Sequence, residues 1–226
     1  MSVRPLDAAI KPAELQRWHI AALVIGVGLL AFAWGGPLPG RAEASFAMHM
    51  VLHMTVVAAA APLLALGLGP LVPPRIAARL GRYALLCAGA EFLMIWAWHA
   101  PALHDLARRE SGLLVLEQAS FLLAGLLVWI SALAGGNGVA RAGGVGSLLL
   151  TSMHMTLLGA LLMFAGRPLY ACADLCSPLA TMTPLQDQQT GGVIMLAVGG
   201  TVYLAGGLSI LGLLLAGRRI APGDAR

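Results

Sequence analysis

The sequence predicts an all-α fold, a polytopic membrane helical bundle of about six transmembrane helices. Its composition is the first reason, because 59% of the 226 residues are hydrophobic and only 11% are charged, with a mean hydropathy of +0.84. The second is a series of apolar runs, each long enough to cross the ~30 Å hydrocarbon core of a bilayer. The third is that Gly- and Pro-rich breaks between the runs are short, which favours antiparallel neighbours within one domain.

The candidate spans, in chain order, are residues 17–34, 45–68, 82–99, 112–133, 144–165 and 187–216. They leave an N-terminal tail at 1–16, a transmembrane domain at 17–216 and a C-terminal tail at 217–226. Trp18 and Trp34 bracket the first span, as an aromatic belt would place them. Charged residues precede this span in a pattern atypical of a cleavable signal peptide, so we expect it to remain as an anchor. The breaks that separate the other runs include Gly35-Gly36-Pro37, Gly69-Pro70, Pro73-Pro74 and Gly135-Gly136-Asn137-Gly138.

Positive charge indicates the orientation, since cytoplasmic loops of membrane proteins are enriched in Lys and Arg. Six spans place both termini on one side, together with ten of the fourteen basic residues: Arg4, Lys11, Arg17, Arg75, Arg79, Arg82, Arg141, Arg218, Arg219 and Arg226. The opposite side has four: Arg41, Arg108, Arg109 and Arg167. Both termini are therefore expected in the cytoplasm. Because the net charge of +4 sits mostly in such loops, we expect a lipid bilayer and no nucleic acid as partner.

The second span opens with the stretch Met48 to Met54, which contains two histidines and three methionines in seven residues. On a helix His49 and His53 are four residues apart and share one face, while Met50 and Met54 form a second such pair. Imidazole and thioether together favour copper, Cu(I) especially, over zinc. We therefore predict a metal site roughly 6 to 12 Å below the outer end of this span.

Other costly polar residues lie in the same half of the membrane, where ionisable groups mark functional sites. We predict His49, His53 and His154 as ligands, with sulfur from Met50 or Met54. An external receiving site or a supporting shell would comprise the remaining polar and thioether candidates: His99, His104, Glu117, Asp187, Met153 and Met155. Two other readings of the histidines stay open, since they can hydrogen-bond helices together or ligate haem in pairs.

Two further features have open interpretations. Glu91, in mid-span, could relay protons, neutralise a bound cation or act as a protonated structural acid. Cys172 and Cys176 lie in a predicted external loop, where they could form a disulfide or a copper-handling thiol pair. Cys87 is expected to be a small buried residue.

These residues resemble the multi-pass cytochrome c oxidase assembly factors known as CtaG, in the form first recognised in Gram-positive bacteria. The resemblance covers about His49 to Gly200. It rests on the following segments: His49 through Pro70, with its His-x-x-x-His-Met start; Trp98-His99-Ala100-Pro101 with His104-Asp105; Leu116-Glu117; Leu157 to Leu162 before Pro168-Leu169-Tyr170; and Asp187-Gln188-Gln189-Thr190-Gly191-Gly192-Val193-Ile194-Met195.

The resemblance implies a bacterial inner-membrane protein, not an enzyme, that delivers copper to a haem-copper oxidase from a site facing the periplasm. Its partners would be an oxidase subunit or a periplasmic copper chaperone. The sequence departs from the family at Gln118, where a histidine is usual, and at Leu196, where a tryptophan often stands; family members also often have seven spans. A haem-bearing membrane oxidoreductase and a metal transporter are the alternatives.

Overall fold

The computed structural model describes residues 12–135, 138–170 and 182–220, and this part of the chain is a bundle of helices. The elements in order are α1 (Pro12–Gly35), α2 (Leu38–Ala44), α3 (Phe46–Met54), η1 (Thr55–Ala60), α4 (Ala61–Leu68), η2 (Gly69–Leu71), α5 (Pro74–Arg82), α6 (Ala84–Trp98), α7 (Pro101–Arg109), α8 (Ser111–Leu133), α9 (Gly138–Met163), α10 (Pro184–Ile194), η4 (Met195–Gly199) and α11 (Gly200–Ile220). The all-α prediction is confirmed.

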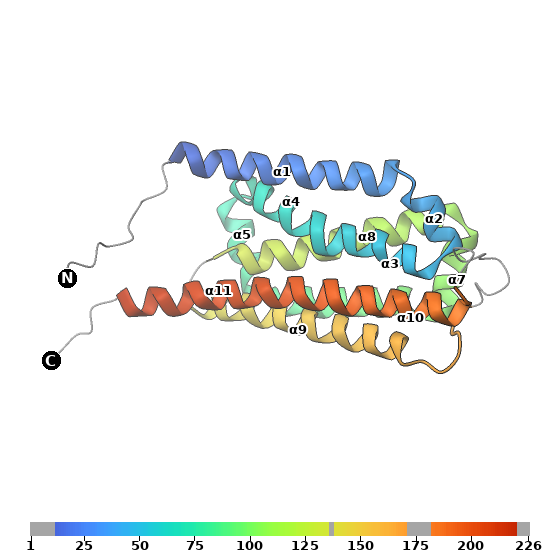
Figure 1. Cartoon of the computed structure of the whole chain (residues 1–226). Coiled ribbons are helices and arrows are strands. Elements are labelled where there is room, and N and C mark those ends of the chain that lie inside the picture. The colour runs from blue at the N-terminus through green and yellow to red at the C-terminus, as the bar shows by residue number, and fades with distance from the viewer. Residues whose placement is uncertain (1–11, 136–137, 171–181, 221–226) are drawn as a thin grey trace, which may run out of the picture.

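The long helices lie roughly side by side (Figure 1). Within the described residues, five helices are long and apolar enough to cross a membrane, namely Gln16–Gly35, Phe46–Leu71, Ser111–Leu133, Gly138–Met163 and Pro184–Ala216. The predicted third span, 82–99, corresponds to α6, and α5 precedes it at a bend of 70°. Counted together as one span, they bring the total to six.

The bundle has two distinct ends (Figure 1). Helix α1 begins and α11 ends at one of them, while the short helices α2 and α7 lie at the other, which we call the α7 end. Both short helices fall in stretches that we expected to be loops. Helix α7, which carries His104, connects the end of α6 next to His99 with the start of α8, which carries Glu117.

Close helix packing requires glycine where α9 meets α10. A Cβ at Gly159 would lie 2.8 Å from the carbonyl oxygen of Gly192 and 2.8 Å from the amide nitrogen of Leu196. Small residues let transmembrane helices approach in this way. The contact sets α10, which carries Asp187, against α9, which carries His154.

Two spans contain a π-helical segment, η1 within Phe46–Leu71 and η4 within Pro184–Ala216. Such segments leave the regular hydrogen-bond ladder and are frequent at functional sites. In η1, the carbonyl oxygen of Val57 lies 3.1 Å from the hydroxyl of Tyr203 on α11. This contact joins η1 to α11 in the buried interior of the bundle.

Candidate metal centre

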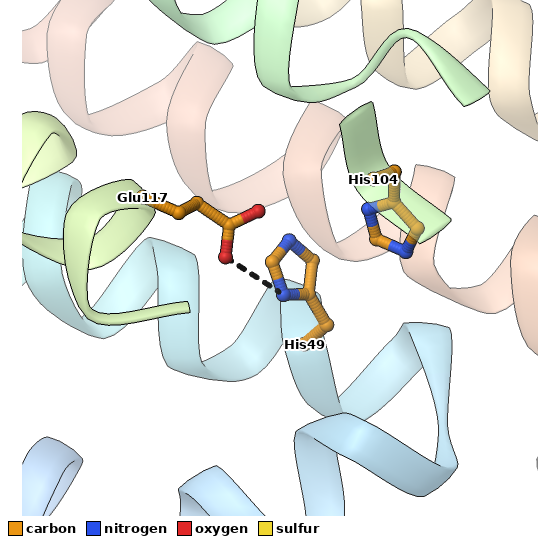
Figure 2. Close-up of side chains that lie close together, drawn as sticks. All are labelled: His49, His104 and Glu117. Carbon is orange, nitrogen blue, oxygen red and sulfur yellow. Dashed lines mark ion pairs between the residues drawn. The ribbon is translucent and has the colours of Figure 1, made fainter. Parts of the chain in front are cut away.

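Three buried side chains converge near the α7 end of the bundle, and we call them the triad. They are His49 on α3, His104 on α7 and Glu117 on α8 (Figure 2). One donor atom from each lies within 4.8 Å of the other two. All three side chains are essentially inaccessible to solvent, with exposed fractions of 0, 1 and 0%. Two imidazole nitrogens and one carboxylate oxygen form a donor set that transition metals accept.

Each member of the triad keeps a buried polar atom without a hydrogen-bond partner among the described residues. These atoms are His49 Nε2, His104 Nδ1 and Glu117 Oε1. Leaving such atoms unpaired costs about 1–3 kcal/mol each. The three unpaired atoms, His49 Nε2, His104 Nδ1 and Glu117 Oε1, are therefore free to bond a ligand.

Arg108 already places a positive charge in the triad. Its Nη1 lies 2.7 Å from His49 Nδ1, and its Nη2 donates to Glu117 Oε2. The His49 Nδ1 atom is also 3.9 Å from Glu117 Oε2. The same carboxylate oxygen accepts a hydrogen bond from Gln118 Nε2 at 3.2 Å. Because the guanidinium neutralises Glu117, a metal ion that enters the triad must displace Arg108 or bind beside a like charge.

Aromatic rings enclose the triad on the side of α7. The rings of Phe46 and Tyr170 stack with centroids 4.7 Å apart, and both contact the ring of His104. Burial, and after it the charge of Arg108, hold the pKa of His104 well below its usual value of 6.5. The imidazole is therefore neutral at pH 7, which is the form that ligates metals.

His53 and His99 lie directly beside the triad. The His53 ring is 6.3 Å from that of His49 and 5.4 Å from that of His99, measured between centroids. Neither nitrogen of His53 has a hydrogen-bond partner in the described structure. The Nδ1 atom of His99 is 2.7 Å from the carbonyl oxygen of Ile95, so its Nε2 is the nitrogen left for a ligand.

His154, which we predicted as a ligand together with His49 and His53, lies next to Glu91. Its Nε2 is 3.7 Å from Glu91 Oε2. The structure thus divides the predicted histidine set between the triad region and a second place deeper in the bundle.

The predicted thioether ligands pack against other helices. A Cβ added at Gly191 of α10 would lie 3.0 Å from Met50 Cγ. One added at Gly199 of η4 would lie 3.3 Å from both Met54 Sδ and Met155 Cβ. Met153 is 65% exposed, so it points away from the bundle interior.

Asp187 was predicted to orient an imidazole. In the structure it lies on α10, and its carboxylate contacts the N-terminus of α3. Its carboxylate accepts hydrogen bonds from the Ser45 hydroxyl at 2.7 Å and from the backbone amides of Phe46 at 2.6 Å and Ala47 at 3.2 Å. A carboxylate at a helix N-terminus satisfies amides that have no partner within the helix. Asp187 thereby holds in place the first turn of the helix that carries His49.

Sequence reasoning missed Arg108 as a site residue, because it was counted only as a loop charge. The available signal was its spacing, since Arg108 follows His104 by four residues and shares its helix face. Cys172 and Cys176 lie outside the described residues.

Comparison with protein families identifies a match over most of the chain. The family described as cytochrome c oxidase caa3 assembly factor (Caa3_CtaG) matches residues 1–215. No curated protein and no solved structure matches the chain.

Proposed function

The chain belongs to the Caa3_CtaG family of cytochrome c oxidase caa3 assembly factors, and from this premise we propose that it assists oxidase assembly by binding copper at the triad. It is a multi-pass membrane protein whose partner is an oxidase. In this proposal the protein carries copper and hands it on without turning over a substrate. A periplasmic copper chaperone would supply the metal.

The observation that carries the proposal is the convergence of His49, His104 and Glu117 within 4.8 Å. Ionisable groups inside a membrane protein are costly and mark functional sites. These three come from separate helices, so their meeting is a property of the tertiary fold. Imidazole nitrogens and a carboxylate oxygen bind copper and also zinc. We propose copper because the family assists the assembly of a cytochrome c oxidase, whose metal centres include copper.

Orientation supports delivery from the outer face. The predicted topology assigns ten basic residues to the side of the two termini and four to the opposite side. Helix α7, with Arg108 and Arg109, belongs to the opposite side, so the α7 end is proposed to face the periplasm of a bacterial inner membrane. The triad would then lie close to the compartment from which an external chaperone could load it.

Copper titration of the purified protein tests the proposal. We expect the wild type to bind Cu(I) and the double variant His49→Ala/His104→Ala to bind one equivalent less. His19→Ala is the matched control, since His19 lies near the start of α1 and contacts the carbonyl oxygen of Leu66. Equal copper in the double variant and the control would refute the proposal.

Two alternatives have distinct signatures in the same preparation. A haem protein would show a Soret band that disappears with its axial histidines. A transporter would move metal across the membrane of a sealed vesicle. Preferential retention of zinc at the triad, measured by competition, would identify the triad as a zinc site.

A further inference from the structure

Helix α5 carries three arginines on one face, which we call the arginine face. Arg75, Arg79 and Arg82 follow one another at spacings of four and three residues, so they lie within about 60° of one another around the helix axis. All three side chains are exposed. Within the described part of the chain, none of them pairs with a carboxylate. The arginine face therefore presents three positive charges to its surroundings.

The other side of α5 packs on the bundle. Gly81 is buried, and a Cβ added there would lie 3.3 Å from Ala134 Cβ and 3.6 Å from the carbonyl oxygen of Ser131. At 3.6 residues per turn, Gly81 is at least about 100° around the axis from each of the three arginines. The packing of Gly81 thus fixes the rotation of α5 and directs the arginine face away from the bundle.

Helix α5 lies at the end of the bundle where α1 begins and α11 ends (Figure 1). Because it meets the apolar helix α6 at a bend of 70°, it runs across the direction of the span rather than along it. Apolar side chains are exposed beside the arginines, since Leu71 is 72% and Ile76 51% accessible. Tyr83, which follows α5 directly, is 43% exposed. A short helix with a basic face, an exposed apolar flank and an aromatic neighbour is typical of the membrane interface.

The chemistry of the arginine face fits phosphate groups. A guanidinium binds a phosphate through two parallel hydrogen bonds, and phospholipids carry their phosphates at the depth of an interfacial helix. Basic residues next to a membrane span attract anionic lipids. Exposed arginines near the starts of α1 and α9, Arg17 and Arg141, add positive charge at the same end of the bundle. A lipid with net negative charge therefore suits this surface better than a zwitterionic one.

We propose that the arginine face of α5 is a binding site for anionic phospholipids. Arg75, Arg79 and Arg82 donate hydrogen bonds to the lipid phosphates, and the acyl chains lie against the apolar flank that contains Leu71 and Ile76. In the orientation proposed above, this site lies in the cytoplasmic leaflet, across the membrane from the triad. It does not depend on metal binding at the triad.

Native mass spectrometry of the full chain in detergent, titrated with dioleoylphosphatidylglycerol or dioleoylphosphatidylcholine, tests the proposal. We expect the wild type to bind the anionic lipid more tightly than the zwitterionic one. Each Arg→Gln substitution on α5 should weaken binding of the anionic lipid about five-fold. Arg75→Gln/Arg79→Gln/Arg82→Gln should weaken it about 100-fold and leave binding of the zwitterionic lipid unchanged.

Two matched variants separate the site from charge in general. Arg41→Gln/Arg109→Gln/Arg167→Gln removes three exposed arginines from the side of the α7 end and should keep the wild-type preference for the anionic lipid. Arg75→Lys/Arg79→Lys/Arg82→Lys keeps the charge without the two-pronged donor and should bind with intermediate affinity. Circular dichroism of each variant should show the helical content of the wild type.

Equal affinities of the wild type for the two lipids would overturn the proposal, and this result does not depend on how any variant folds. The same loss of anionic lipid in the control triple variant as in the α5 triple variant would also refute it, because the binding would then follow net charge alone. Inorganic phosphate at millimolar concentration should not displace the lipid. Displacement would assign the arginine face to free phosphate instead.

Discussion

Replacing Arg108 with glutamine should tighten metal binding at the triad. In the metal-free protein the guanidinium contacts His49 Nδ1 at 2.7 Å and donates to Glu117. A metal bonded about 2 Å from that nitrogen would lie within roughly 5 Å of the guanidinium. At an effective dielectric constant of about 20, two unit charges at this separation repel by about 3 kcal/mol. Removing the arginine charge should therefore strengthen Cu(I) binding about 100-fold.

The same substitution should weaken the metal-free fold, because it leaves Glu117 without its cation. Removing one partner of a buried ion pair typically costs about 3–5 kcal/mol, so the thermal midpoint should fall without copper and recover with it. A competition titration with a chelator of known affinity measures the binding, and Arg109→Gln, an exposed neighbour on α7, is the matched control. Equal affinities in the two variants would refute the view that Arg108 competes with the metal.

Two other perturbations follow from contacts near the triad. Asp187→Asn should lower the free energy of unfolding by about 1–3 kcal/mol, because it weakens three hydrogen bonds to the start of α3. It should also reduce copper affinity, because His49 on α3 is then displaced. Unchanged melting and copper-titration curves would contradict this role of Asp187. Metal-free protein should lose stability as the pH falls below 6.5, because the unfolded chain takes up a proton at His104 that the folded chain, with its lowered pKa, does not. His104→Gln should flatten that slope in thermal melts from pH 7 to 5, and an equally steep slope would refute the assignment.

Apolar run length made most of the bundle predictable. A run of about 20 apolar residues is the length that a transmembrane helix needs. The predicted spans around Trp34, His53 and Trp129 therefore lie near the bounds of the observed helices. Helix α5 was missed because its residues, Pro74–Arg82, include three arginines and were read as a loop that ends where the predicted third span begins. Helix α7 was missed because its nine residues, Pro101–Arg109, are amphipathic rather than apolar, and hydropathy does not detect such a helix.

The candidate site was only half predictable from residue types. His49, His53 and Glu117 were recognised because each is a costly group within an apolar run, and His104 because it follows one closely. Glu91 was noticed without a partner. Its pairing with His154 joins α6 to α9, and no local pattern encodes that contact.

Sequence by itself predicted how deep each polar residue lies, because the rise along a helix converts residue number into depth. The distribution of arginines also predicted which side of the membrane the histidines occupy. Only the tertiary structure decided which donors meet, since that depends on how each helix is rotated about its axis and on how α7 folds over the bundle. Packing of Phe46 and Tyr170 against His104 brings α7 onto α3, and so places both a ligand and its competing cation, Arg108, beside His49.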